Sequence, residues 1–124
     1  MLVYEKNDRL KYMRNIDIES LDELDTQLTQ NQAAIVFFSG SSCNVCTVLK
    51  PKVIELINTS FPNMQFISVD CDKSPEVAGQ NSVLSIPTVI VYFDGKEGLR
   101  FTRSFSIGEL EANIKRTYDL MFGE

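Results

Sequence analysis

Apolar and polar residues alternate along the chain with two different periods, which predict strands in some segments and helices in others. The apolar runs at 33–38 and 88–93 are too short for helices and are typical of buried strands. Residues 64–70 largely alternate between apolar and polar side chains, as a strand with one buried face does. After a turn expected at Asp94-Gly95, residues 99–103 are predicted to return as an antiparallel strand.

Helical spacing of leucine, isoleucine and valine predicts helices between these strands. Ser20 and Ser106 are each followed three residues later by glutamate, a capping-box pattern that marks helix starts. These helices are expected to end near residues 30 and 121. A longer helix is expected from about Cys43 to Ile57, with Pro51 inside it. A short helix is expected after Ser74-Pro75, with the serine as N-cap and the proline as first helical residue.

The predicted order is helix, strand, helix, strand, helix, strand, strand, helix. Alternating strands and helices favour parallel pairing, and the final hairpin adds an antiparallel pair. We therefore expect one α/β domain over residues 1–124, with a central mixed sheet flanked by helices on both faces. Residues 1–15 are an N-terminal extension of uncertain structure, in which residues 2–4 and 10–13 could form short strands.

The charge balance and the amino-acid composition exclude several classes of function. The formal net charge is −5, the isoelectric point is about 4.7, and there is no histidine. No basic cluster is large enough for a nucleic-acid partner, and an acidic surface disfavours anionic membranes. Without histidine, Ser-His-Asp and Cys-His catalysis and His-containing metal sites are excluded.

Localisation is expected to be cytoplasmic. The chain begins with polar and charged residues, without the apolar stretch of a signal peptide. The longest apolar run, Ala33 to Phe38, has six residues and cannot span a membrane.

The chain has three cysteines, so they cannot all be paired in disulfides within one chain.

Two of the cysteines, in the sequence Cys43-Asn-Val-Cys46, lie where a buried strand gives way to a helix. Residues three apart share a helix face, and the first turn can bring their sulfurs within bonding range. Unpaired N–H groups and the positive end of the helix dipole would lower the pKa of the Cys43 thiol. Cys46, one turn deeper, would then attack a mixed disulfide formed on Cys43.

Other interpretations of the cysteines stay open. Zinc would need two more ligands, for which only Cys71 and carboxylates remain, and the pair could also be inert packing residues. Cys71 by itself is a half-buried structural residue or a third thiol for regulation. Pro87, in Ile86-Pro87-Thr88, could merely begin a strand. It could also follow a cis bond that exposes the Ile86 backbone to an extended peptide.

Together, the cysteine pair after a buried strand, Pro51 in the helix, Ile86-Pro87-Thr88 and Asp94-Gly95 resemble the thioredoxin family over about residues 16–122. The resemblance implies a mixed sheet of four or five strands with helices on both sides. It also implies that Cys43 is the attacking cysteine and Cys46 the resolving one, with Pro87 as a cis-proline beside them.

Some positions near the cysteines depart from the family pattern of Trp-Cys-Gly-Pro-Cys. Ser42 replaces the tryptophan, and Asn44-Val45 replace Gly-Pro. The glycine that usually faces the site before the last helix corresponds to Arg103 or Ser104. These differences bear on how a substrate fits.

The family's buried aspartate and its lysine neighbour correspond to Phe37 and Phe66. Their joint loss is physically consistent, because either charge alone would be buried without a partner. The aspartate is thought to help deprotonate the resolving thiol. Without it, an apolar setting should raise the pKa of the Cys46 thiol and slow the resolving step.

The resemblance implies a thiol–disulfide oxidoreductase that acts on disulfides in other proteins. Ile86, Pro87 and Ser42 would bind the substrate. Electrons would come from a partner reductase, because the chain has no Gly-rich nucleotide loop for a bound cofactor. No bound metal is expected. The protein is expected to be a monomer. The alternative function is a thioredoxin-fold binding module or adaptor with little redox turnover.

Overall fold

The computed structural model describes residues 15–123. The short strands considered at residues 2–4 and 10–13 lie outside this described range. Within the described range, the elements in chain order are β1 (Asn15–Ile18), α2 (Leu21–Gln30), β2 (Ala33–Ser39), α3 (Asn44–Ser60), β3 (Gln65–Asp70), α4 (Pro75–Gln80), β4 (Thr88–Phe93), β5 (Lys96–Thr102) and α5 (Ile107–Phe122).

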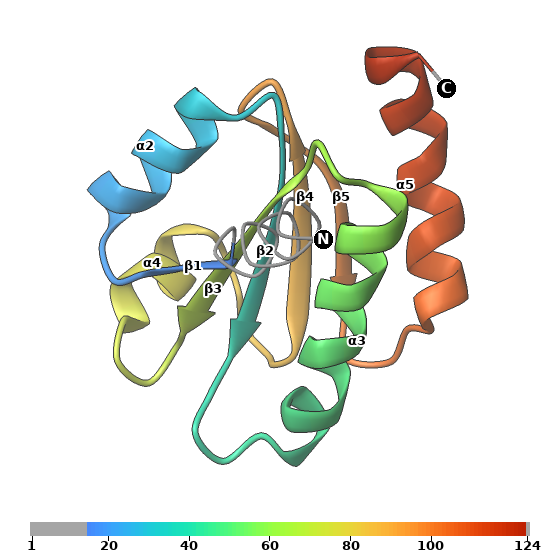
Figure 1. Ribbon diagram of the computed structural model, residues 1–124. Coiled ribbons are helices and arrows are strands. Elements are labelled where there is room, and N and C mark those ends of the chain that lie inside the picture. Colours follow the sequence, from blue (N-terminus) through green and yellow to red (C-terminus); the bar gives the residue numbers. More distant parts are fainter. Residues whose placement is uncertain (1–14, 124) are drawn as a thin grey trace, which may run out of the picture.

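The described strands form one mixed sheet in the order β1-β3-β2-β4-β5 (Figure 1). β3 pairs in parallel with both β1 and β2, whereas β4 pairs antiparallel with β2 and β5. The parallel pairs are joined through helices and the antiparallel pair β4–β5 by a tight turn, as the sequence predicted. The antiparallel pairing of β4 with β2 differs from the parallel pairing expected of a strand that follows a helix, because the connection from β3 through α4 returns the chain in the opposite direction beside β2. The predicted α/β class and mixed sheet are confirmed.

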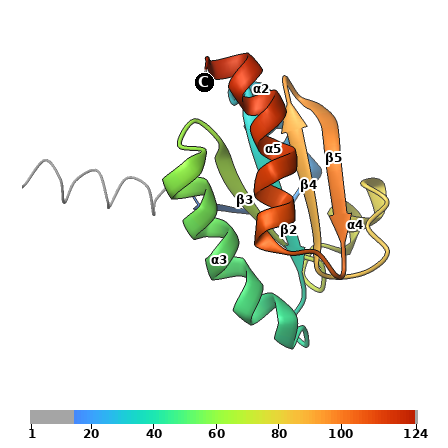
Figure 2. The same cartoon turned by 90° about the vertical axis from the view of Figure 1, so that its right-hand side faces the viewer.

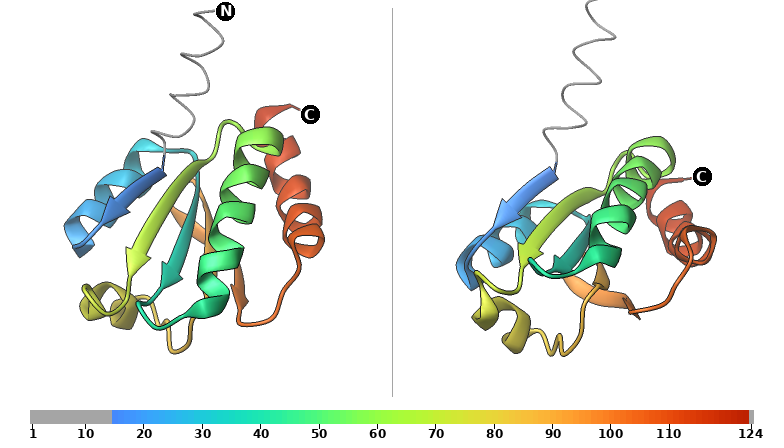
Figure 3. Two further views of the ribbon diagram at one scale, coloured as in Figure 1. Left: turned by 60° about the horizontal axis from the view of Figure 1, so that its bottom comes forward. Right: turned by 90° about the horizontal axis from the view of Figure 1, so that it is seen from below.

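Helices cover both faces of the sheet: α3 and α5 lie on one face, and α2 and α4 on the other (Figures 2 and 3). Every residue of β2 from Ala33 to Phe38 is buried, because its side chains alternate between the two covered faces. Odd-numbered side chains such as Ile35 and Phe37 pack under α3 and α5. Even-numbered ones such as Val36 pack under α2 and α4. The continuous apolar run was therefore correctly interpreted.

Strand β1 was not predicted, and Asn15, assigned to the N-terminal extension, is its first residue. The strand has only four residues, of which Ile16 and Ile18 are apolar. A pattern this short carries little information about structure. It becomes a strand because the exposed edge of β3 supplies hydrogen-bonding partners, with Asn15 opposite Phe66.

The helix caps follow the sequence at two of the three predicted positions. Ser106 and Glu109 form both bonds of a capping box. Ser20 accepts from the Glu23 N–H at 3.1 Å, although the Glu23 carboxylate accepts from Glu19 rather than from Ser20.

Ser74 occupies the N-cap position of α4, but its side chain does not cap the helix, so that expectation is corrected. Its hydroxyl instead donates to the Glu19 carbonyl at 3.2 Å. Ser74 is buried between α4 and the segment after β1, where that carbonyl is the partner within reach. The serine therefore ties these two segments together.

The hairpin between β4 and β5 turns at Asp94 and Gly95, whose φ angles of 55° and 78° are left-handed, as the sequence predicted. β5 begins at Lys96, three residues before the expected start, and a register shift occurs opposite Val91 and Tyr92. The exposed residues at the start of β5 do not have an apolar strand pattern, so pairing with β4 determines where it begins. None of the helices in residues 15–123 is both long and apolar enough to cross a membrane.

Candidate functional site

Three loops meet at one edge of the sheet, at the bottom of Figure 1. They connect β2 to α3, α4 to β4, and β5 to α5. The register explains why: Phe38 near the end of β2 lies opposite Thr88 at the start of β4, and Thr88 lies opposite Thr102 at the end of β5. The topology thus brings the cysteine pair and the segment around Pro87 to the same edge.

Cys43 and Cys46 form a disulfide at the start of α3, with Cα atoms 5.3 Å apart. Cys43 is the N-cap residue, with an extended backbone, and its Sγ accepts a hydrogen bond from the Cys46 N–H at 3.2 Å. A sulfur at this position faces the unpaired N–H groups of the first turn. The predicted placement of the pair at the tip of a helix is confirmed.

The two cysteines differ in their access to solvent. Cys46 is 5% exposed and belongs to the core under α3 and α5, whereas Cys43 is partly exposed at the surface. A visiting molecule can therefore approach Cys43 more readily than Cys46. The expected difference in depth is confirmed.

Below the disulfide, the core is apolar. Phe37 on β2 and Phe66 on β3 share a cluster with Cys46, and their rings stack with centroids 6.2 Å apart and planes 30° apart. They are 0% and 3% exposed. In the described part of the chain, the buried polar residues are the neutral Ser68, Ser74 and Thr88. No buried acid or base therefore lies within this core.

An aspartate that the sequence analysis missed anchors the loop before Cys43. One carboxylate oxygen of Asp72, Oδ2, accepts from the Ser41 N–H at 2.8 Å and from the Ser41 hydroxyl at 2.6 Å. These hydrogen bonds lower the pKa of Asp72. The residues are 31 positions apart, so no local pattern signals the contact. Ser42, the next residue, is exposed.

Ile86 and Pro87 lie beside the disulfide loop, and the peptide bond between them is cis. The Ile86 side chain reaches the loop before Cys43, since a Cβ added at Gly40 would lie 2.8 Å from Ile86 Cδ1. Of the two interpretations of Pro87 drawn from the sequence, the cis bond is the one observed.

An open groove of about 650 Å³ runs beside this bond. It is bordered by α3, the β5–α5 loop and the start of α5. Its lining residues are Val45, Leu49, Ile86, Pro87, Arg103, Ser104, Phe105, Ser106 and Glu109. The groove thus contains two of the predicted substrate-binding residues, Ile86 and Pro87, whereas the third, the exposed Ser42, is not among its lining residues.

Arg103 lies directly across from Pro87. Its N–H donates to the Pro87 carbonyl at 2.8 Å, and its φ of 61° is left-handed. Glycine adopts such a conformation most easily. Of the two residues that could correspond to the family's glycine, Arg103 has this backbone and Ser104 does not.

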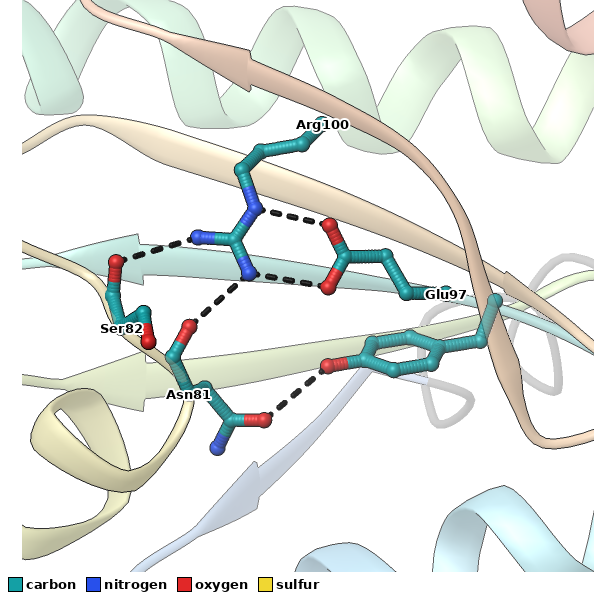
Figure 4. Close-up of polar contacts among 5 residues, drawn as sticks. Asn81, Ser82, Glu97 and Arg100 are labelled. Atoms are coloured by element: carbon teal, nitrogen blue, oxygen red, sulfur yellow. Dashed lines mark hydrogen bonds and ion pairs between the residues drawn. The ribbon is translucent and has the colours of Figure 1, made fainter.

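A second polar cluster supports the loop that leads to Pro87 (Figure 4). The Arg100 guanidinium pairs with Glu97 at 2.8 and 2.9 Å and donates to the carbonyls of Ser82 and Asn81 at 3.2 and 2.9 Å. The Tyr92 hydroxyl donates to the Asn81 side chain at 3.3 Å. Hydrogen bonds from Arg100 lower the pKa of Glu97. Burial, followed by the charge of Glu97, raises the pKa of Tyr92 to about 12.

Cys71 directly follows the last residue of β3, Asp70, and is half-buried. Burial, together with the charges of Asp70 and Asp72, raises the pKa of its thiol to about 11. Among residues 15–123, no group of three or more Cys, Asp or Glu side chains is arranged to hold a metal ion.

Comparison with known proteins agrees with this geometry. The family model for thioredoxin matches residues 15–116. The thioredoxin-like protein YdfQ of Bacillus subtilis is 31% identical over 107 residues, which are 86% of this chain and 95% of the relative. Thioredoxin-1 of Saccharomyces cerevisiae is 29% identical over 79 residues, which are 64% of this chain and 76% of the relative.

Among solved structures, the oxidised form of mitochondrial thioredoxin 3 from Saccharomyces cerevisiae superposes with a TM-score of 0.76 at 25% identity. The superposition covers 86% of this chain and 98% of that one. A family match across most of the chain, a relative covered almost end to end, and a matching fold all agree, so the chain belongs to the thioredoxin family.

Proposed function

We propose that this protein exchanges the Cys43–Cys46 dithiol and disulfide with disulfides in protein substrates. Membership of the thioredoxin family and a disulfide-capable pair support thiol–disulfide oxidoreductase chemistry in general. The observation that carries the proposal is the unequal exposure of the two sulfurs at a helix start. Cys43 is partly exposed beside a groove, and Cys46 is buried in the core behind it.

In the first step, the Cys43 thiolate attacks one sulfur of a substrate disulfide. A bond forms between Cys43 and that sulfur, and the other substrate sulfur leaves as a thiolate that takes up a proton. Because Cys43 is the N-cap of α3, N–H groups and the positive end of the helix stabilise its negative charge. The same stabilisation makes Cys43 a good leaving group in the second step.

In the second step, Cys46 loses its proton and attacks Cys43. The Cys43–Cys46 disulfide forms, and the second substrate thiol is released. Two electrons have then passed from the protein dithiol to the substrate disulfide. Regeneration of the dithiol needs an electron donor, for which we propose a partner reductase rather than a bound cofactor.

Substrate binding is assigned to the surface around Ile86 and Pro87 and to Ser42, the exposed residue directly before Cys43. Ile86 and Pro87 line the groove beside the cysteines, and an extended substrate segment could pair there with the Ile86 backbone. The acidic composition disfavours nucleic acid and anionic membranes as partners. We also propose a monomer in the cytoplasm.

Reduction of insulin in the presence of dithiothreitol tests the proposal. The wild type is expected to accelerate insulin precipitation, and Cys43→Ser is expected to return it to the uncatalysed rate. Cys71→Ser is the matched control, because it removes a thiol outside the pair, and it should retain activity. Equal acceleration by wild type and Cys43→Ser would reject catalysis by this pair.

The alternative is a binding module or adaptor in which the cysteines turn over little. The buried, uncharged surroundings of Cys46 favour it, because they supply no base for the second step. An adaptor would bind partners equally well with and without Cys43 and would not accelerate insulin reduction. The same assay therefore separates the two functions.

A further inference from the structure

The side chain of Arg103 offers a charged contact at the substrate groove. Arg103 is exposed and lines the groove together with Ile86 and Pro87. The Arg103 N–H is bonded to the Pro87 carbonyl, so the start of this side chain is held next to the proposed substrate-binding segment. A substrate bound there would lie within reach of the guanidinium.

The backbone at this position makes arginine an unexpected residue. A left-handed φ of 61° is disfavoured for residues with long side chains, and glycine would adopt it without steric cost. Of the other residues with left-handed φ in the described chain, Asp94 and Gly95 form the hairpin turn, Ser82 follows the end of α4, and Gly123 caps the end of α5. Arg103 is the one that lines the groove. Strained residues cluster at active sites and ligand-binding sites, where the surrounding structure holds them in place.

The charge of Arg103 is available to a ligand. In residues 15–123 no carboxylate lies within ion-pair distance of it. The other charged residue of the groove, Glu109, accepts a hydrogen bond from the Ser106 N–H within the capping box of α5. The Glu109 carboxylate thus stabilises the start of α5, whereas the Arg103 guanidinium has no carboxylate partner among the described residues.

We propose that Arg103 selects substrates that carry an aspartate or glutamate next to the disulfide cysteine. The inference rests on the proposed function, since it assigns a substrate class to the same groove. A carboxylate on the substrate would pair with the guanidinium while Cys43 attacks the adjacent sulfur. The exchange itself is unchanged: two electrons pass from the protein dithiol to the substrate disulfide. Arg103 alters only which disulfide is held in place.

Three peptide disulfides test the proposal. Each is a symmetric dimer of the same short peptide, with glutamate, glutamine or lysine on both sides of the cysteine. The prereduced protein is mixed with each peptide in a single turnover, and the released peptide thiol is measured by chromatography. The rate for each peptide is divided by the rate at which dithiothreitol alone reduces the same peptide. This ratio corrects for the intrinsic reactivity of each disulfide.

The wild type is expected to reduce the glutamate peptide about threefold faster than the glutamine peptide, the size of effect that one partly exposed ion pair produces. The preference should disappear in Arg103→Gly, whose backbone suits the left-handed conformation and so keeps the fold. It should reverse toward lysine in Arg103→Glu. Added salt should weaken it, because salt screens exposed charges.

Lys96→Gln is the matched control. It removes one positive charge at the other end of β5 from Arg103, so it changes the net charge equally without touching the groove. It should keep the preference for glutamate. A wild type without preference, or an Arg103→Gly variant that retains it, would overturn the role of Arg103 while leaving the proposed function intact. Failure of the wild type to reduce any peptide faster than Cys43→Ser would overturn the function and the inference together.

Discussion

Ser41 and Asp72 are joined by two hydrogen bonds to a single carboxylate oxygen, although 31 residues separate them. The contact ties the loop before Cys43 to the segment that follows β3. Because Asp72 binds both the backbone and the side chain of Ser41, it limits how far this loop can move. The position of Cys43 at the start of α3 thus depends on a residue outside the cysteine motif.

The Ser41–Asp72 contact should make the free energy of unfolding depend on pH in the acidic range. Since the folded-state pKa of Asp72 lies below its ordinary value of 3.8, the carboxylate stabilises the fold at neutral pH. This contribution is lost as pH falls through the lowered pKa. Asp72→Asn is therefore expected to be less stable than wild type at pH 7, and the difference should vanish in strong acid. Urea unfolding at a series of pH values measures it, with Asp17→Asn as an exposed control. A difference that is constant with pH would contradict the prediction.

The apolar core below Cys46 should slow the second step of exchange. Phe37 and Phe66 leave no buried base near this thiol, and an apolar setting disfavours its thiolate. We expect a mixed disulfide between substrate and Cys43 to accumulate transiently in the wild type and to persist in Cys46→Ser. Rapid acid quenching followed by mass spectrometry detects both species. If the wild type never accumulates a mixed disulfide, the core does not limit resolution.

The Cys71 thiol should be unreactive at neutral pH. Its pKa of about 11 means that only a small fraction is thiolate near pH 7, and the thiolate is the nucleophile. In the oxidised protein, where Cys43 and Cys46 are paired, alkylation by iodoacetamide should be slow at pH 7 and should accelerate up to about pH 11. Mass spectrometry measures the rate, with a short unfolded peptide containing cysteine as reference. Equal rates for protein and peptide at pH 7 would refute the raised pKa.

Arg100 should stabilise the loop that carries Ile86 and Pro87. It is paired with Glu97 and binds two carbonyls after α4, and its side chain is 29% exposed. Arg100→Met, which replaces the unbranched stem of the side chain but removes the guanidinium, is expected to lower the free energy of unfolding by about 1 kcal/mol.

Glu97→Gln serves as the comparison for this variant. It weakens the ion pair but leaves the carbonyl contacts of Arg100 in place, so a smaller loss of stability is expected. Denaturant unfolding measures both variants. An equal loss in the two would mean that the ion pair, rather than the loop contacts, accounts for the stabilisation.

The parts of the structure that were predicted correctly are those whose cause is local. The serine–glutamate pairs begin α2 and α5 because a side chain three residues away reaches the first free N–H groups. The apolar run of β2 marks a strand that both sheet faces bury. The place of Cys43 and Cys46 between that strand and a helix was visible for the same reason.

Errors arose where a distant partner determines the outcome. β1 is a strand because β3 offers an edge, and Ser74 binds the Glu19 carbonyl instead of capping α4. Neither partner is visible in the neighbouring residues.

By itself, the sequence determined the fold class, the order of most elements and the position of the cysteine pair, because periodicity, caps and turns act over a few residues. Only the tertiary structure decided that Ile86–Pro87 is cis, that Arg103 rather than Ser104 has the left-handed backbone, and that Asp72 anchors Ser41. Each of these depends on segments that the sheet brings together from far apart in the chain. Local sequence patterns do not encode that proximity.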